Sequence, residues 1–339
     1  MENKQATWVR AFTNIAFIKY WGKANEELMI PMNNSLSLTL DAFYTDTKVT
    51  FDPSLTRDEL WLDGILEDEK ALNKAKVILD LVREQAGIDT CARIDSINHV
   101  PTAAGLASSA SGLAALAGAA SLAAALDLSP TDLSRLARRG SGSASRSIYG
   151  GFAEWEQGTN DLDSYAVPVD DANWDIGMIF IIVDDKRKDI SSTEGMRRVV
   201  ETSPYYDGWV QSTGEDLVAI KAAILEQDIV TVGEIAERSA LKMHALNLSA
   251  NPPFNYWSPD SIIAMRKVEE LREMGYPVYL TMDAGPNVKL ICKGSQMDEI
   301  QHILLKDYRA DQLVLAHPGP AIQILDQADR SQNQENHRD

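Results

Sequence analysis

Apolar residues recur along the chain at two spacings, and each spacing occupies its own blocks of sequence. A spacing of three to four residues predicts amphipathic helices, whereas alternation and short continuous apolar runs predict strands. The helices predicted in this way cover residues 69–85, 112–126, 130–139, 216–226, 229–246 and 259–274. The predicted strands cover residues 35–40, 45–51, 91–97, 167–169, 176–183, 277–282 and 288–292.

Short polar sequences mark the ends of some of these elements. Ser129, followed by Pro130, is typical of a helix start, because serine caps the helix and proline fits its first turn. Asp63-Gly64 is typical of a hairpin turn. Residues 184–194 turn abruptly charged and polar after a buried strand, which predicts a mobile loop near a domain boundary.

The order of the elements favours an α+β fold. Strands come in runs rather than in strict alternation with helices, so a doubly wound parallel sheet is not expected. A chain of 339 residues is long for a single core, which suggests two domains. We place the first domain at residues 1–185 and the second at residues 186–328, followed by a disordered polar tail at residues 329–339.

The formal charge of −18 narrows the possible partners. Binding of nucleic acid requires a basic surface, which so acidic a chain is not expected to have. We therefore expect no nucleic-acid partner. An anionic substrate would need positive charge concentrated at its site. The candidates for that charge are Lys19, Lys23, Arg146 and residues 186–188. With no signal segment and no apolar run long enough to span a bilayer, we expect a cytoplasmic protein without a membrane partner.

Residues 101–112 read Pro-Thr-Ala-Ala-Gly-Leu-Ala-Ser-Ser-Ala-Ser-Gly and directly precede the alanine-rich helix. Free backbone N–H groups and the helix dipole make such a segment a good phosphate site. Gly105 and Gly112 allow a ligand to approach closely, and the serine hydroxyls add donors. The segment lacks the Gly-Lys-Ser/Thr ending of a Walker A loop. On composition alone, a small-residue entry to a buried helix explains it equally well.

Three further motifs accompany this loop. They are Asn14-Ile15-Ala16-Phe17-Ile18-Lys19-Tyr20-Trp21-Gly22-Lys23, the segment at residues 139–152 rich in glycine and serine, and Thr281-Met282-Asp283-Ala284-Gly285-Pro286-Asn287-Val288-Lys289. With all four in this order, the chain resembles the mevalonate diphosphate decarboxylases of the GHMP kinase superfamily, from about Trp8 to about Leu325. The resemblance implies the GHMP kinase fold, in which an N-terminal ATP-binding domain and a C-terminal domain face each other across an active-site cleft.

Asp283 and Arg146 are the main catalytic candidates. Asp283 ends an apolar strand on a tight turn that can project its carboxylate into a cleft, and the resemblance places the matching aspartate at the substrate hydroxyl. A turn aspartate bonded to its own backbone is the competing interpretation. Arg146 follows a Gly-Ser-Gly-Ser loop, and the resemblance assigns it to the substrate carboxylate or a phosphate. A surface arginine is the alternative, although it would oppose the dipole of a nearby helix start.

The N-terminal motif supplies further candidates, which depend mainly on the resemblance. Lys19, Tyr20 and Lys23 would bring two charges and a phenol to the diphosphate, and Lys19 is also counted among the catalytic groups. Asn14, a fourth catalytic candidate, would hydrogen bond the hydroxyl or the carboxylate. Simple solvation of the lysines and turn formation by the asparagine are the competing interpretations.

Serines supply the other expected substrate contacts. Ser141 and Ser143 would donate hydrogen bonds to the diphosphate, although helix capping also selects serine. Ser192, in a Ser-Ser pair that matches the family's loop, would close over the substrate phosphates. Many members of the family have a basic residue directly after this pair, whereas Thr193 follows it here, which puts one charge contact in doubt.

The resemblance also implies ATP and Mg²⁺ as cofactors. The residues expected around ATP are Pro101, Ala104, Gly105, Leu106, Ala107, Ser108, Ser109 and Ser111. Magnesium would bind the ATP phosphates, with Ser108 as its protein ligand and water elsewhere. The five histidines are too dispersed along the sequence to predict a metal site.

The expected function is ATP-dependent decarboxylation of mevalonate 5-diphosphate to isopentenyl diphosphate, CO2, ADP and phosphate. A tertiary hydroxyl leaves poorly, so phosphorylation by ATP must first convert it into a leaving group. Decarboxylation of phosphomevalonate and phosphorylation of mevalonate at C3 are alternatives on the same scaffold. A catalytically dead ligand sensor is a further alternative, which the retention of Asp283 and of the phosphate loop disfavours. The family implies a homodimer.

Overall fold

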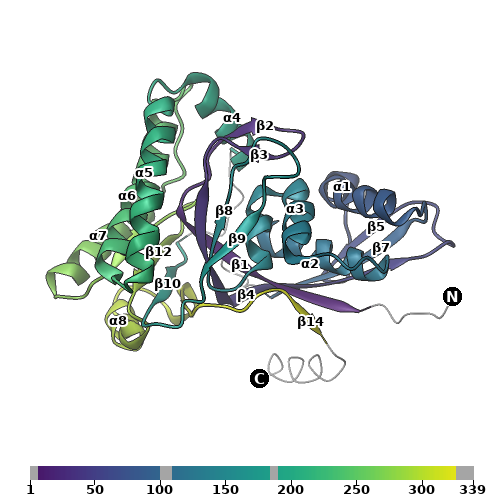
Figure 1. Ribbon diagram of the computed structural model, residues 1–339. Helices are drawn as coiled ribbons and strands as arrows, with labels where there is room; N and C mark the ends of the chain where they lie inside the picture. Colours follow the sequence, from purple (N-terminus) through teal and green to yellow (C-terminus); the bar gives the residue numbers. More distant parts are fainter. Residues whose placement is uncertain (1–6, 100–108, 184–189, 326–339) are drawn as a thin grey trace.

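The computed structural model describes residues 7–99, 109–183 and 190–325 (Figure 1). Its strands are β1 (Trp8–Ile18), β2 (Lys23–Asn25), β3 (Ile30–Pro31), β4 (Ser35–Phe51), β5 (Glu59–Leu62), β6 (Ile65–Leu66), β7 (Ala92–His99), β8 (Phe152–Trp155), β9 (Ala166–Asp170), β10 (Gly177–Ile181), β11 (Tyr279–Thr281), β12 (Val288–Cys292), β13 (Leu313–Ala316) and β14 (Gln323–Leu325). Its α-helices are α1 (Glu69–Ala86), α2 (Ser109–Ala123), α3 (Pro130–Gly140), α4 (Ser192–Thr202), α5 (Tyr206–Leu225), α6 (Ile229–Ser249), α7 (Pro259–Glu273) and α8 (Met297–Leu304). Three short 3₁₀ helices are η1 (Gly142–Ile148), η2 (Gly294–Gln296) and η3 (Ala310–Gln312).

The strands form two main sheets. In the first sheet the order is β14-β1-β4-β7-β5-β6, with β8 and β9 joined through β4. The second sheet is antiparallel with the order β11-β12-β10-β13. Helices α1 to α3 lie toward one end of the molecule and α5 to α7 toward the other, with β1, β4, β8 and β9 between them (Figure 1). The α+β class expected from the sequence is confirmed. Within the described residues, no helix has both the length and the apolar character needed to cross a membrane.

The long strand β4 organises the first sheet. It pairs with β1 along one edge and with β8 and then β7 along the other. The prediction of two separate strands at residues 35–40 and 45–51 was wrong. The polar break at Asp41 is a bulge within one strand, because the pairing with β1 shifts register between Phe12 and Asn14.

Helix α2 packs closely on the first sheet because small side chains line it. Ala114, Ala117 and Ala120 are fully buried. A side chain in place of Gly118 would meet Val9 Cγ1 at 3.0 Å and the side chain of Ile322 at 2.9 Å. At the other end of the helix, Thr13 Oγ1 donates to Ser111 Oγ at 3.4 Å, so the first turn of α2 lies near the middle of β1.

A second core joins the two sheets. Phe43 of β4 and Phe180 of β10 meet edge to face with their ring centroids 4.7 Å apart. Apolar residues of α5 and α6, including Ile220 and Val232, complete this core, while α7 and α8 cover the other face of the second sheet. The packing of α6 against both sheets brings the end of β1 next to the ends of β11 and β12.

Most predicted helices are confirmed, but one starts earlier than predicted and a further helix replaces the end of a predicted loop. Ser129 caps α3, and the Asp63-Gly64 turn joins β5 to β6 with φ angles of 51° and 80°. Helix α5 begins at Tyr206 rather than at residue 216, because the aromatic residues of its first turn are buried. The loop expected to reach residue 194 ends earlier, since Ser191 accepts the backbone N–H of Glu194 and starts α4. Residues 184–189 lie outside the described residues.

The chain passes between the sheets more than once. Strand β10 already pairs within the second sheet, and β14 returns to pair with β1 of the first. The domain limits 1–185 and 186–328 stay a prediction, as does disorder at residues 329–339, which lie outside the described part of the chain.

Candidate active site

Asp283 lies between two buried lysines. It follows the end of β11, Lys19 follows β1, and Lys289 belongs to β12. The Nζ atom of Lys19 is 2.8 Å from Oδ1 of Asp283, and that of Lys289 is 2.9 Å from Oδ2. The side chains of the lysines are 2% and 3% exposed, whereas that of Asp283 is 40% exposed. Within this trio, the carboxylate is the group that another molecule can reach.

The charges within this trio shift the pKa values of Asp283 and Lys19. Burial alone would raise the pKa of Asp283, but the positive charges of Lys19 and Lys289 outweigh it and hold that pKa far below its ordinary value. Burial lowers the pKa of Lys19 to about 8, against the attraction of Asp283, and the charge of Lys289 adds to the lowering. At neutral pH the carboxylate is therefore ionised and Lys19 is mostly charged.

Arg146 is buried beneath β4 in the 3₁₀ helix η1. Its Nε donates to Ser37 Oγ at 2.8 Å, and Nη1 donates to Ser35 Oγ. Burial lowers the pKa of Arg146 to about 10, opposed by the charge of Asp283, so the guanidinium stays charged. Among the described residues, no carboxylate lies within ion-pair distance of it. A buried cation with only neutral partners favours a nearby anion.

Asn14 holds Arg146 in place. Its Nδ2 donates to the Ser143 carbonyl at 2.9 Å and to Ser147 Oγ at 2.8 Å. Its Oδ1 accepts a longer bond from Nη2 of Arg146 at 3.3 Å. These contacts indicate a positioning role, and a direct contact between Asn14 and substrate stays a prediction.

The predicted diphosphate residues lie between the end of β1 and the start of β2, and at the start of η1. Tyr20 packs edge-on against Trp155, with centroids 4.9 Å apart, and its Oη has no partner within the described residues. Burial raises the pKa of Tyr20, so its hydroxyl remains a donor. The Oγ atoms of Ser141 and Ser143 are 3.3 Å apart. Lys23 is half-buried at the start of β2, and burial lowers the pKa of its ammonium. Contacts of these residues with diphosphate stay predictions.

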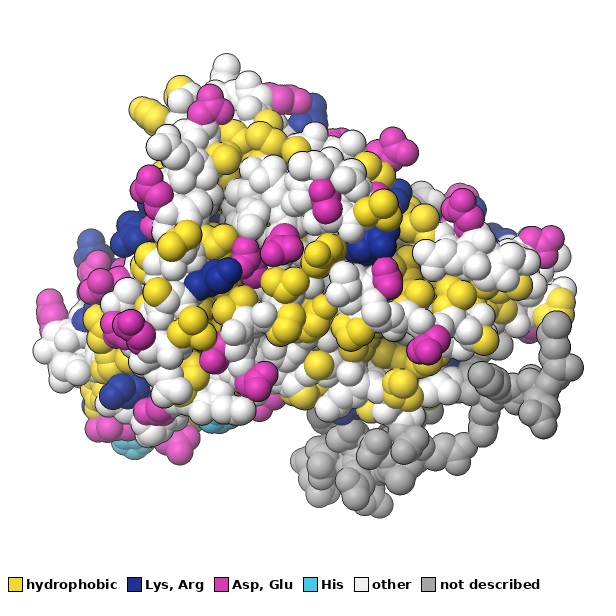
Figure 2. Space-filling model, in the orientation of Figure 1, with side chains coloured by type: hydrophobic (Ala, Val, Ile, Leu, Met, Phe, Trp, Pro, Cys, Tyr) yellow, Lys and Arg dark blue, Asp and Glu magenta, His cyan; other side chains and the backbone are white. Residues whose placement is uncertain are grey.

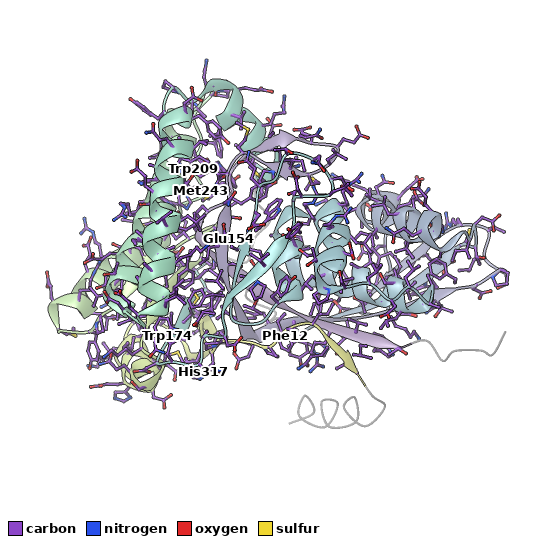
Figure 3. All side chains as sticks on the ribbon, viewed as in Figure 1. Phe12, Glu154, Trp174, Trp209, Met243 and His317 are labelled. Atoms are coloured by element: carbon purple, nitrogen blue, oxygen red, sulfur yellow. The ribbon has the colours of Figure 1, made fainter. Side chains whose placement is uncertain are left out.

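Ser192 is the first residue of α4 and is half-buried. Helix α4 packs on an apolar cluster that contains Trp21 and Ala284, which belong to the first and last motifs. Trp209 of α5 and Met243 of α6 also belong to this cluster (Figure 3). The start of α4 is therefore supported by the same packing as the two motifs, whereas a phosphate contact of Ser192 stays a prediction.

Most of the predicted phosphate loop lies outside the described residues. The loop residues outside the described part of the chain are Pro101, Ala104, Gly105, Leu106, Ala107 and Ser108. Ser109 is exposed at the start of α2, whereas Ser111 is fully buried, with its Oγ 2.9 Å from Thr45 Oγ1. That burial favours a structural role for Ser111, so its ATP contact stays an unsupported prediction. The first turn of α2 holds no acidic residue, so its dipole is free to attract an anion.

Positive charge is concentrated at this site despite the acidic chain. Acidic side chains are spread over the visible surface with basic ones between them (Figure 2). In the interior, by contrast, Lys19, Lys289 and Arg146 surround the single carboxylate of Asp283. Such a surplus of buried cations can bind an anion while Asp283 accepts a hydrogen bond. Residues 186–188, the other basic candidate, lie outside the described residues.

A hollow of about 360 Å³ elsewhere on the first sheet is a weaker anion site. It is lined by Lys48 and Arg93, but Asp95 pairs with both, and each cation lies over a tryptophan ring. Their charges are already compensated. The chemistry is therefore assigned to the surroundings of Asp283.

Sequence reasoning missed Lys289, Ser35 and Ser37. Lys289 interrupts an otherwise apolar five-residue strand, and a charge in such a strand requires a partner. Ser35 and Ser37 alternate with leucines in β4, so one face of that strand carries hydroxyls. Both features are visible in the sequence. Only the fold shows that Lys289 contacts Asp283 and that the two serines contact Arg146.

Comparison with known proteins agrees with this geometry. The family model described as "Diphosphomevalonate decarboxylase-like N-terminal domain" matches residues 11–166, and that described as "Mevalonate 5-diphosphate decarboxylase C-terminal domain" matches residues 178–337. The diphosphomevalonate decarboxylase of Candida albicans is 35% identical over 88% of this chain and 88% of its own length.

Solved structures are more similar still. The mevalonate diphosphate decarboxylase from Enterococcus faecalis is 51% identical, with a TM-score of 0.90 over 95% of this chain and 99% of that chain. A structure of MDDEF in complex with MVAPP, AMPPCP and magnesium is 52% identical, with a TM-score of 0.91 over the same shares of the two chains. From its sequence, fold and site, the chain belongs to the diphosphomevalonate decarboxylase family.

Proposed function

We propose that this protein catalyses ATP-dependent decarboxylation of mevalonate 5-diphosphate to isopentenyl diphosphate, CO2, ADP and phosphate. The observation that carries the proposal is the reachable carboxylate of Asp283 between Lys19 and Lys289. This arrangement provides an acceptor for the substrate hydroxyl and positive charge for its anionic groups. Membership of the family supports the reaction class, which is that of a carboxy-lyase.

Asp283 accepts a hydrogen bond from the C3 hydroxyl and orients its oxygen for phosphorylation. Because two ammonium groups hold its pKa low, Asp283 is a weak base. It therefore positions the hydroxyl, whose proton becomes acidic only as the new O–P bond forms.

Arg146 and Lys19 stabilise the charges of the substrate. Arg146 provides the positive charge toward which the substrate carboxylate binds, and Lys19 acts near the reacting oxygen. When the C3–O bond breaks, phosphate leaves and the electron pair of the C1–C2 bond forms the C2=C3 double bond. The carboxyl carbon is then released as CO2.

The diphosphate binds to Tyr20, Lys23, Ser141 and Ser143, and Ser192 closes over it. Among the described residues no group accepts a hydrogen bond from Tyr20 Oη, which supports this assignment, because a buried donor of this kind is suited to a ligand oxygen. Asn14 contributes by holding Arg146 and the backbone at Ser143.

ATP binds at the start of α2 and supplies the phosphoryl group, with Mg²⁺ neutralising its phosphates. The uncompensated dipole of α2 fits an anion, and Ser109 is exposed there. A magnesium ion bound to ATP is held mainly by phosphate oxygens and water. Ser108 is the proposed protein ligand of the ion.

We also propose a cytoplasmic homodimer in which residues 1–185 and 186–328 form the two domains. Light scattering coupled to size exclusion checks the assembly. A homodimer would give twice the mass of the 37.4 kDa chain, and a monomer would contradict it.

Parallel measurement of CO2 and ADP release tests the function. The enzyme is supplied with magnesium ATP and, separately, mevalonate 5-diphosphate or mevalonate 5-phosphate. Equal release of both products from the diphosphate alone supports the proposal. ADP without CO2 identifies a kinase, turnover of the monophosphate identifies the other substrate, and no turnover of either supports a ligand sensor.

A further inference from the structure

Lys289 has so far appeared only as one of the two cations that keep Asp283 ionised, although it contacts the central carboxylate directly. We infer that Lys289 is a positioning residue for the reaction, which holds the second oxygen of Asp283 so that the carboxylate stays fixed and faces the substrate. The inference depends on the proposed function, because it assumes that Asp283 acts at the substrate hydroxyl.

The place of Lys289 in the fold is unusual for a lysine. Strand β12 is central in the second sheet, where Lys289 pairs in register with Phe180 of β10 and Thr281 of β11. The five residues of β12 are all buried. A lysine in such a strand is costly unless a counter-ion compensates its charge, and Asp283 at 2.9 Å is that counter-ion.

Burial separates the role of Lys289 from substrate binding. Its side chain is 3% exposed, whereas that of Asp283 is 40% exposed. A molecule that approaches from solvent therefore reaches the carboxylate before it reaches the lysine. Lys289 acts through Asp283.

The two lysines hold different oxygens of the carboxylate. Lys19 takes Oδ1 and Lys289 takes Oδ2, which together fix rotation about the Cβ–Cγ bond of Asp283. Without Lys289, one oxygen loses its anchor and the carboxylate can turn away from the reacting hydroxyl. A misplacement of this kind lowers the rate of the chemical step more than it weakens binding.

The surroundings of Asp283 make its protonation measurable. The charged or titratable groups that act on it are Lys19 after β1, Lys289 on β12, Arg146 on η1 and His244 on α6. Burial lowers the pKa of His244 to about 3, so this imidazole is neutral at the pH of the assay. An acid limb of kcat that appears when Lys289 is changed therefore reports on Asp283.

The test compares K289M with K289R and with K242M. Lys242 also pairs with a buried aspartate, Asp216, at 2.7 Å, but it lies outside the site, which makes K242M a matched control. We expect K289M to lower kcat by about 10- to 100-fold with both KM values within about threefold of the wild type. Its acid limb should move upward by about 1 pH unit or more, because one of two nearby cations is lost. K289R, which keeps the charge, should restore the pH profile, and K242M should leave it unchanged.

Several outcomes would overturn the inference. They are an unchanged kcat and pH profile in K289M, an increase in KM alone, or an equal effect of K242M. K289Q is the second variant and carries the same expectations if K289M does not fold. In the D283N background, K289M should cause no further loss, and additive losses would contradict action through Asp283. A wild-type enzyme without CO2 release would instead refute the proposed function.

Discussion

Two aspartates in this molecule each bind two cations, but with opposite exposure. At Asp216 of α5 the carboxylate is 6% exposed, and its partners on α6, Arg238 and Lys242, are 49% and 29% exposed. At Asp283 the carboxylate is 40% exposed, and both lysines are almost completely buried. The two clusters therefore contain the same charges, but the aspartate is the buried member of one and the exposed member of the other.

The difference separates a structural cluster from a functional one. Around Asp216, water solvates the cations, so the ion pairs mainly join α5 to α6. Around Asp283, the cations are buried away from water, so their positive charges are poorly screened. They therefore act strongly on the exposed carboxylate and on any anion bound beside it. In the Asp216 cluster the exposed groups are cations that water solvates, whereas in the Asp283 cluster the exposed group is a carboxylate that a substrate can contact.

The largest expected effect is on the exposed carboxylate. D283A should lower kcat by about 100-fold or more, because the acceptor that orients the hydroxyl is lost, while the KM for ATP stays within about threefold. Steady-state ADP release at varied ATP provides both constants. Near-normal turnover of a folded D283A enzyme would remove the functional distinction between the two clusters.

Arg146 extends the comparison to a third buried cation. R146K should lower kcat/KM by about 10- to 100-fold, since lysine cannot reproduce the planar contacts with Ser35 and Ser37 and the same reach toward an anion. Kinetics at varied mevalonate 5-diphosphate measure the effect. Wild-type values would make Arg146 a residue of the scaffold, like Arg238.

The pH dependence of activity should reveal the burial of Lys19. Its pKa of about 8 predicts that kcat/KM falls by up to about tenfold per pH unit above pH 8, as the ammonium loses its proton. K19R should move this limb to higher pH. An alkaline limb at the same pH in K19R would show that another group is responsible.

Between about pH 8 and 10.5, the stability of the protein should rise with pH, whereas the activity should fall. The folded pKa of Lys19 lies below its ordinary value of 10.5, so the unfolded chain binds more protons between about pH 8 and 10.5. The contribution of Lys19 to the free energy of unfolding therefore rises across this window while activity falls. Denaturant unfolding of the wild type and K19R at pH 7.5 and 9.5 isolates that contribution.

The smallest expected effect belongs to the structural cluster. D216N should lower the free energy of unfolding by about 1 kcal/mol, because its partners are substantially exposed and water compensates much of the loss. Urea denaturation measures the change, and it should shrink in high salt. A loss above about 3 kcal/mol would mean that the Asp216 cluster is as desolvated as the one at Asp283.

Elements with a strong local signal could be predicted from the sequence. Periodicity placed α1 and α6, and Ser129 marked the start of α3. Helix α4 was missed although Ser191 and Glu194 form a typical start signal, because the charged residues before it suggested a loop. Strand β14 was missed because three residues at an edge carry little pattern of their own.

The site was predictable only in part, because motifs identify residues but not their neighbours. Lys19 and Asp283 stand 264 positions apart in the sequence, and only the packing of β1 and β11 against the same helix, α6, makes them an ion pair. Arg146 was expected at an anion, whereas its serine partners on β4 could not be inferred from its own motif. Long-range register, which the sequence pattern does not encode, decides both contacts.

The rate of CO2 release from mevalonate 5-diphosphate by D283N and D216N, at saturating ATP and equal folded enzyme, tests the central claim most directly. Both variants remove one negative charge between two cations and keep the shape of the side chain. We expect D216N to match the wild type within about twofold and D283N to be slower by about 100-fold or more. Similar rates in the two variants would contradict the functional role of Asp283, because the exposed carboxylate would then have no special part in the reaction.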